Sequence, residues 1–233
     1  MTATHTDSRD RRDMPNHPLT EASRWLGIKP GRLRDWLVGR PDPARPGKRL
    51  LEPVLAPALA KPPTLSFWNL VECSVLASIR DEHGASLQKV RKALRFVARE
   101  LGQQRPLIEQ EFSTDGVHLF VRHYGKLVSA SQQGQTVMRE VLEASLRRVD
   151  RDSDGLAKRL FPWLKEPNEP RILAVDPAVA FGRPIVAGTR VPAETLFERF
   201  RAGDSIQHLA AEYDVAHILI EDLVRIWFAA AAA

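Results

Sequence analysis

The chain has 233 residues and a formal net charge of +5, and hydrophobic residues make up 43% of it. These values are ordinary for a globular protein with room for one large domain or two small ones, and no stretch reaches the roughly 18 consecutive apolar residues of a membrane span. The single cysteine, Cys73, excludes an intrachain disulfide and a cysteine-based zinc site, and it fits a reducing cytoplasm.

The beginning of the chain divides into a polar segment and a basic segment. Residues 1–17 are polar and charged, without the apolar core of a secretory signal, and we expect them to form a flexible tail. Residues 19–61 contain nine lysines and arginines and four acidic residues. The net charge of this segment therefore equals that of the whole chain, and positive and negative charges cancel in the remainder. A charge excess confined to one short segment favours a polyanion-binding site over a merely solvated surface.

Two short helices are predicted within the basic segment. The first has Thr20 as its N-cap, buries Trp25 and ends at Gly27. The second begins at Pro30 and buries Trp36. Two helices joined by a tight glycine turn are typical of the helix-turn-helix unit, whose second helix enters the major groove of DNA. The basic residues that would face the DNA here are Lys29, Arg32 and Arg34.

A basic turn follows the two helices. The run Arg45-Pro46-Gly47-Lys48-Arg49 predicts a β-hairpin wing, with Arg45, Lys48 and Arg49 placed on DNA phosphates. The sequence LTEASRWLGIKPGRLRDWL, together with the residues up to about Pro57, is similar to the N-terminal module of MerR-type regulators. This resemblance implies a winged helix-turn-helix domain over residues 18–61 and a dimer that binds a roughly palindromic operator.

Residues 62–164 are expected to form a mostly helical middle region that begins at a Pro-Pro boundary. Apolar spacing and capping residues predict helices over residues 67–82, 87–101 and 134–149. A β-hairpin is predicted over residues 107–121, where two alternating segments flank a Ser-Thr-Asp-Gly turn. The first part of this region is similar to the segment that follows the wing in MerR-like proteins, where it helps to organise the dimer.

The C-terminal region, residues 171–233, is expected to follow a proline-containing linker at residues 165–170. Its most distinctive stretch is Gly182-Arg183-Pro184, followed by Gly188-Thr189-Arg190-Val191-Pro192. The glycines can take positive φ and the prolines fix the backbone direction, which predicts a stiff loop that presents Arg183 and Arg190. Three short helices are expected after the loop. Their residues 204–228 hold five acids against one arginine, which disfavours a second DNA-binding surface.

The run from Asp176 to Val215 resembles a small domain of unknown function that is frequent in bacterial antitoxins. With the MerR-like module in front of it, the order of elements resembles antitoxins of the VapB class in type II toxin–antitoxin pairs. The resemblance implies a homodimer that inhibits a PIN-like ribonuclease toxin and represses its own operon. The sequence itself has no P-loop, dinucleotide fingerprint or metal-ligand pair, so we expect a non-enzymatic, cytoplasmic protein without cofactor or metal. PIN-like nucleases hold a metal with clustered carboxylates, and Arg183 and Arg190 are the candidates to bridge these carboxylates.

Other interpretations remain open at the level of the sequence. Each loop arginine could instead satisfy carbonyls or a carboxylate within its own domain. The chain could also be a stand-alone MerR-like transcription regulator, or an adaptor that binds only protein and whose basic segment is a solvated surface. DNA binding without a neighbouring toxin gene would indicate the regulator, whereas the absence of a specific footprint on DNA would indicate the adaptor.

Overall fold

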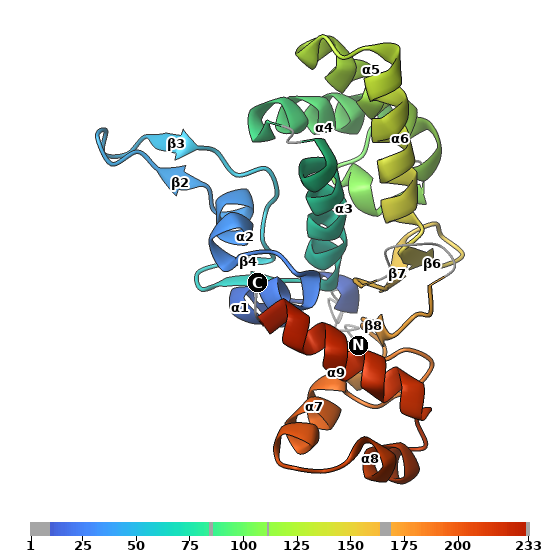
Figure 1. Cartoon of the computed structure of the whole chain (residues 1–233). Coiled ribbons are helices and arrows are strands. Elements are labelled where there is room, and N and C mark those ends of the chain that lie inside the picture. Colours follow the sequence, from blue (N-terminus) through green and yellow to red (C-terminus); the bar gives the residue numbers. More distant parts are fainter. Residues whose placement is uncertain (1–9, 84–85, 111, 164–168, 232–233) are drawn as a thin grey trace, which may run out of the picture.

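A computed structural model describes residues 10–83, 86–110, 112–163 and 169–231 of the chain. These residues are mainly helical, with short strands that pair in antiparallel fashion, so the predicted mainly-α fold class with short hairpins is confirmed. Figure 1 shows two helices and a hairpin on one side, a group of longer helices above, and a C-terminal unit below. None of the described helices combines the length and the apolar character needed to cross a membrane.

The first part of the fold contains the helices α1 (Leu19–Leu26) and α2 (Pro30–Leu37) and a hairpin of β2 (Arg40–Pro41) and β3 (Arg49–Leu51). Gly27 ends α1 in the left-handed conformation with φ 65°, and Pro30 is the first residue of α2, both as predicted. The prediction of Thr20 as a cap is wrong, because Thr20 already lies in the first turn of α1. The hairpin projects away from the helices in Figure 1.

The residues before α1 are not a free tail from Asp10 onward. A short 3₁₀ helix (Arg11–Asp13) leads to β1 (His17–Pro18), which pairs with β5 (Pro63–Leu65), and β5 also pairs with β4 (Leu59–Ala60). Arg12 forms an ion pair with Asp152. The expectation of a flexible tail is therefore wrong for residues 10–17, and residues 1–9 lie outside the described part. The expected boundary after residue 61 falls at the tip of the β4–β5 hairpin.

The middle of the chain forms a group of packed helices. They are α3 (Phe67–His83), α4 (Leu87–Leu101), α5 (Val117–Val128) and α6 (Gln132–Leu146). The Ser66 hydroxyl accepts a hydrogen bond from the Asn69 N–H (3.3 Å) at the start of α3, as the side chain of an N-cap residue does. After α6, a hairpin of β6 (Val149–Arg151) and β7 (Ala157–Leu160) leads to the C-terminal unit.

The β-hairpin predicted over residues 107–121 is wrong. These residues form a 3₁₀ turn (Pro106–Ile108), a wide helical turn (Phe112–Gly116) and the first part of α5. The apolar residues of the segment also occur at helical spacing, which places them on one buried face of α5: Val117, Phe120, Val121 and Tyr124. Burial of this face against the neighbouring helices outweighs the local turn signal of Ser-Thr-Asp-Gly.

The C-terminal unit joins a small strand pair to three helices. The strands are β8 (Leu173–Ala174) and β9 (Ile185–Val186), and the helices are α7 (Ala193–Arg201), α8 (Ile206–Tyr213) and α9 (His217–Ala231). The predicted linker at residues 165–170 lies mostly outside the described residues, which resume at Glu169.

Trp25 of α1 completes the core of the C-terminal unit. Trp25 is 3% exposed and packs on Trp227 of α9, with ring centroids 4.7 Å apart in an edge-to-face arrangement. The Trp163 indole N–H donates to the Trp25 carbonyl at 3.0 Å. Core packing was the role predicted for Trp25, but its partners come from the far end of the chain. The helix α1 therefore belongs to two cores at once, because Ala22 on the same helix lies in the core of α2 and α3.

Candidate functional site

Some of the predicted DNA-contacting residues of α2 and its hairpin are bound to other groups of the chain, and others are not. Lys29, Arg34 and Lys48 are exposed, and within the part of the chain that the structure describes they have no ion-pair partner. Lys29 stands directly before α2, Arg34 lies on its exposed side, and Lys48 follows Gly47 at the tip of the hairpin. These three side chains can meet a phosphate or a base edge without giving up a contact within the protein.

Arg32 does not point outward as the sequence predicts. Its guanidinium pairs with Asp81 of α3 (Nη1 to Oδ1, 2.6 Å) and lies 4.9 Å from the ring of Trp36. The side chain is about one third exposed, and its Nε is buried without a hydrogen-bond partner. Arg32 therefore braces α2 against α3, and it would have to leave Asp81 before it could read a base.

The two remaining arginines of the prediction support the hairpin. Arg45 Nε donates to the buried carboxylate of Asp42 at 2.8 Å, and Arg49 Nη1 donates to the carbonyl of Val38 at 2.6 Å. Both side chains are still exposed on their outer sides. They hold the turn in place, so that Lys48 is presented at its tip.

A second basic surface on α4 was missed by counting charges over long segments. This helix carries five cations against one acid, although the chain outside residues 19–61 is balanced in sum. A count over the helix alone would have found them: Lys89, Arg91, Lys92, Arg95 and Arg99, against Glu100.

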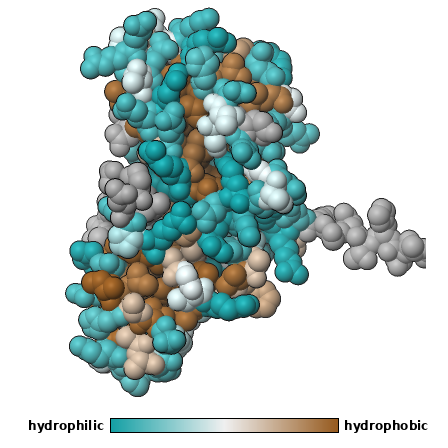
Figure 2. Space-filling view, turned by 90° about the vertical axis from the view of Figure 1, so that its right-hand side faces the viewer, coloured by the Kyte–Doolittle hydropathy of each residue, from teal (hydrophilic) through white to brown (hydrophobic). Residues whose placement is uncertain are grey.

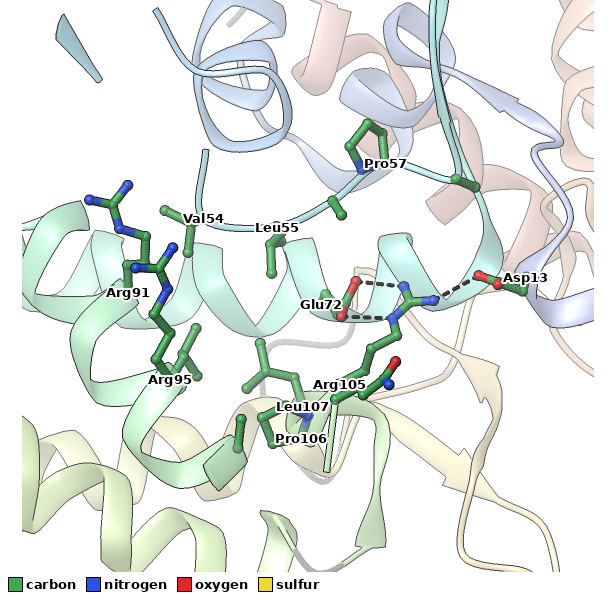
Figure 3. Close-up of a pocket in the computed structure, with 15 residues that line it drawn as sticks. Asp13, Val54, Leu55, Pro57, Glu72, Arg91, Arg95, Arg105, Pro106 and Leu107 are labelled. Carbon is green, nitrogen blue, oxygen red and sulfur yellow. Dashed lines mark hydrogen bonds and ion pairs between the residues drawn. The ribbon is translucent and has the colours of Figure 1, made fainter. Parts of the chain in front are cut away.

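A pocket lined by α4 shows how two of these cations are placed. Figure 3 shows Arg91 and Arg95, one helical turn apart, at one end of it, and Glu72, Arg105 and Asp13 at the other. At the second end, Arg105 bonds both carboxylate oxygens of Glu72 (2.7 and 3.0 Å) and pairs with Asp13 (2.7 Å). The charge of Arg105 is therefore balanced by Glu72 and Asp13, and these ion pairs connect the N-terminal segment to α3.

The predicted arginine loop is rigid because its backbone groups are paired. Gly188, with φ 81°, completes a turn in which the Thr189 hydroxyl donates to the Val186 carbonyl (2.9 Å) and accepts from the Val191 N–H (3.0 Å). The Ala193 N–H, the first of α7, donates to the Pro184 carbonyl at 2.9 Å. Gly182, with φ 78°, and Gly188 both take the positive φ that the sequence allows, and α7 begins directly after Pro192.

Both loop arginines are presented to solvent. The side chains of Arg183 and Arg190 are exposed, and neither has an ion pair or a side-chain hydrogen bond to any described residue. The nearby buried carboxylate of Asp176 is taken by Arg159 instead, at 2.9 Å. The alternative that the two arginines satisfy groups of their own domain is therefore not what the structure shows.

Apolar side chains also reach the surface of the C-terminal unit. In Figure 2, brown side chains gather on the lower part of the molecule, which Figure 1 identifies as this unit. Its exposed large hydrophobic residues include Ile218 and Phe228 of α9 and Phe181 of the loop, and Phe181 is 89% exposed. Phe181 was not predicted as a site residue, although it stands directly before Gly182, the first residue of the Gly-Arg-Pro signature.

Comparisons with known proteins match the C-terminal unit to one family and most of the chain to two further proteins. Residues 173–225 match a family described as "Protein of unknown function (DUF433)". The chain is 26% identical over 230 residues to "Putative antitoxin VapB45" of Mycobacterium tuberculosis (strain ATCC 25618 / H37Rv), which covers 91% of this chain and 93% of that protein. The X-ray crystal structure of Rv2018 from Mycobacterium tuberculosis shares the fold, with a TM-score of 0.67 and 22% identity over 94% of this chain and 99% of that one. The likeness therefore extends far beyond the C-terminal unit.

Proposed function

We propose that this chain is the antitoxin of a type II toxin–antitoxin pair. In this proposal it binds and inhibits a PIN-like ribonuclease through the C-terminal unit and represses its own operon through α2 and the β2–β3 hairpin. The observation that carries the proposal is the pair of exposed arginines, Arg183 and Arg190, which have no partner among the described residues and lie on a loop fixed by hydrogen bonds of Thr189. The likeness to a VapB-named protein over most of both chains supports the same role.

The inhibitory contact follows from the chemistry of the guanidinium group. A planar guanidinium can donate two parallel hydrogen bonds to a carboxylate, and such charge-assisted pairs are strong where water is excluded. A nuclease that holds its metal with clustered carboxylates offers acceptors of this kind. Since Arg183 and Arg190 give up no partner within the chain, they can neutralise these carboxylates and compete with the metal ion.

The repressor contact uses the basic surface at the other end of the molecule. We propose that two copies of the chain bind an operator, each placing α2 in a major groove and the tip of its hairpin on the backbone. Arg34 and Lys29 are the free cations of α2, and Lys48 is the free cation of the hairpin. The exposed cations of α4 add to the positive field that steers DNA towards the protein.

The test is co-expression of this chain with the open reading frame next to its gene. We expect a stable complex with a small nuclease that is inactive on RNA in the complex and active when freed. Replacing both Arg183 and Arg190 by alanine should abolish inhibition and leave the folded content and melting temperature unchanged, because both side chains lack internal partners. Replacing Arg159, which holds the buried Asp176, should instead lower stability.

Two other outcomes would change the assignment. A chain that elutes without a partner and shifts its promoter DNA would be a stand-alone MerR-like regulator. A double arginine variant that still inhibits the nuclease fully would remove the loop arginines from the inhibitory contact.

A further inference from the structure

The Gly-Arg-Pro loop holds an aromatic ring in solvent. Phe181 is 89% exposed, whereas the next most exposed large hydrophobic side chain of the described residues, Ile218, is 58% exposed. The neighbours of Phe181 are packed: Ala180 contacts the small core around Phe161, and Gly182 is buried. The loop is thus anchored to the protein on both sides of a ring that the protein does not cover.

The backbone that presents this ring is strained. Ala180, Phe181 and Gly182 all have positive φ, at 48°, 56° and 78°. Only glycine enters this region freely, and for residues with a Cβ it costs free energy. Two bonds hold the conformation: the Gly182 N–H donates to the Val179 carbonyl (2.9 Å), and the Arg183 N–H donates to the Ala180 carbonyl (3.1 Å). Strained backbone of this kind persists where the surrounding structure supports it, and it is common at binding sites.

We propose that Phe181 is the hydrophobic anchor of the toxin-binding surface. The ring inserts into an apolar pocket of the nuclease whose rim carries the carboxylates that Arg183 and Arg190 meet. This inference rests on the function proposed above, and it adds a recognition residue of a different chemistry. A desolvated aromatic anchor beside arginines is the usual composition of an interface hot spot, where a few residues supply most of the binding energy.

The surroundings of Phe181 define where the partner would lie. A hollow beside the ring is bounded by the start of α1 and by α7, and its lining includes Glu21, Trp25, Arg183 and Glu194. A nuclease segment that covers Phe181 would enter this hollow and contact α1 as well as the loop. The partner therefore presents an apolar pocket for the ring and carboxylates for the arginines, and it can place a cation near Glu21 and Glu194.

The decisive variant is Phe181→Gly, because it separates folding from binding. Glycine accepts positive φ without strain, so we expect a melting temperature at or above that of the unaltered chain. Loss of the ring should weaken binding to the purified nuclease by at least about 30-fold, measured by isothermal titration calorimetry. Phe181→Leu keeps an apolar side chain and should weaken binding less. Leu50→Ala on the hairpin, where Leu50 is 56% exposed, is the matched control and should bind as the unaltered chain does.

The outcomes of this experiment are separable. If the unaltered chain does not bind the nuclease, both the proposed function and the role of Phe181 are wrong. If it binds, and Phe181→Gly binds within about threefold of it, the anchor is refuted while the antitoxin function stands. Equal losses in Phe181→Gly and Leu50→Ala would also refute the anchor, since they would show a non-specific effect of removing exposed apolar area.

Discussion

Mild acid should destabilise this protein through His17. The side chain is 4% exposed, in β1 beside the arginine loop, and burial lowers the pKa of its imidazole to about 4 from the usual 6.5. Below pH 6.5 the unfolded chain takes up a proton at this position while the folded chain does not, so the unfolded state is stabilised relative to the folded state as the pH falls towards 4. With these two values, the folded state loses about 2 kcal/mol between pH 7 and pH 5, and above pH 7 the effect vanishes.

The assay is chemical denaturation at pH 7, 6 and 5, for the unaltered chain and for His17→Gln. The pKa values of Asp10 and Asp152 are lowered, so both carboxylates keep their charge between pH 7 and pH 5. They therefore add little to the change of stability with pH in this range. His17→Gln should be less stable at pH 7 and should lose much less stability on going to pH 5. Equal slopes for His17→Gln and the unaltered chain would refute the reasoning.

Two further predictions concern the basic surface and the shared core. Lys48→Ala should weaken binding to all DNA sequences and reduce the slope of log affinity against log salt by about one unit, whereas Lys126→Ala on α5 should leave the slope unchanged. An unaltered slope in Lys48→Ala would exclude a phosphate contact. Trp25→Ala should lower the free energy of unfolding by about 3–5 kcal/mol, because it empties the junction between α1 and α9. A loss below about 1 kcal/mol in denaturation would show that the C-terminal unit does not depend on α1.

The elements with strong local signals could be predicted from the sequence. Gly27 fixes the C-terminal end of α1, and Pro30 fixes the start of α2. Each of these signals acts within about four residues, so the chain itself carries the information. The prediction for residues 107–121 was wrong because their apolar spacing fits both a strand and a helix. Packing against distant parts of the chain decided in favour of the helix.

The contacts of Trp25 could not be predicted, since they depend on residues far along the chain. Its carbonyl accepts from Trp163, 138 positions later, and its ring packs on Trp227. Hydrophobic periodicity shows that Trp25 is buried, but it does not show against what. In the same way, the sequence placed Arg183 on a stiff loop but left open whether a carboxylate of its own domain would meet it.

Pairing within the chain also decides which of the predicted DNA-contacting cations are available to a phosphate. Of the six residues predicted to contact it, Arg32, Arg45 and Arg49 already hold partners, namely Asp81, Asp42 and the Val38 carbonyl. A paired cation gains less on reaching a phosphate, because it must first give up a contact or share it. The three free cations, Lys29, Arg34 and Lys48, should therefore set most of the salt dependence of this surface. Asp81→Asn would release Arg32 and should make the salt slope steeper, which a charge count along the sequence does not foresee.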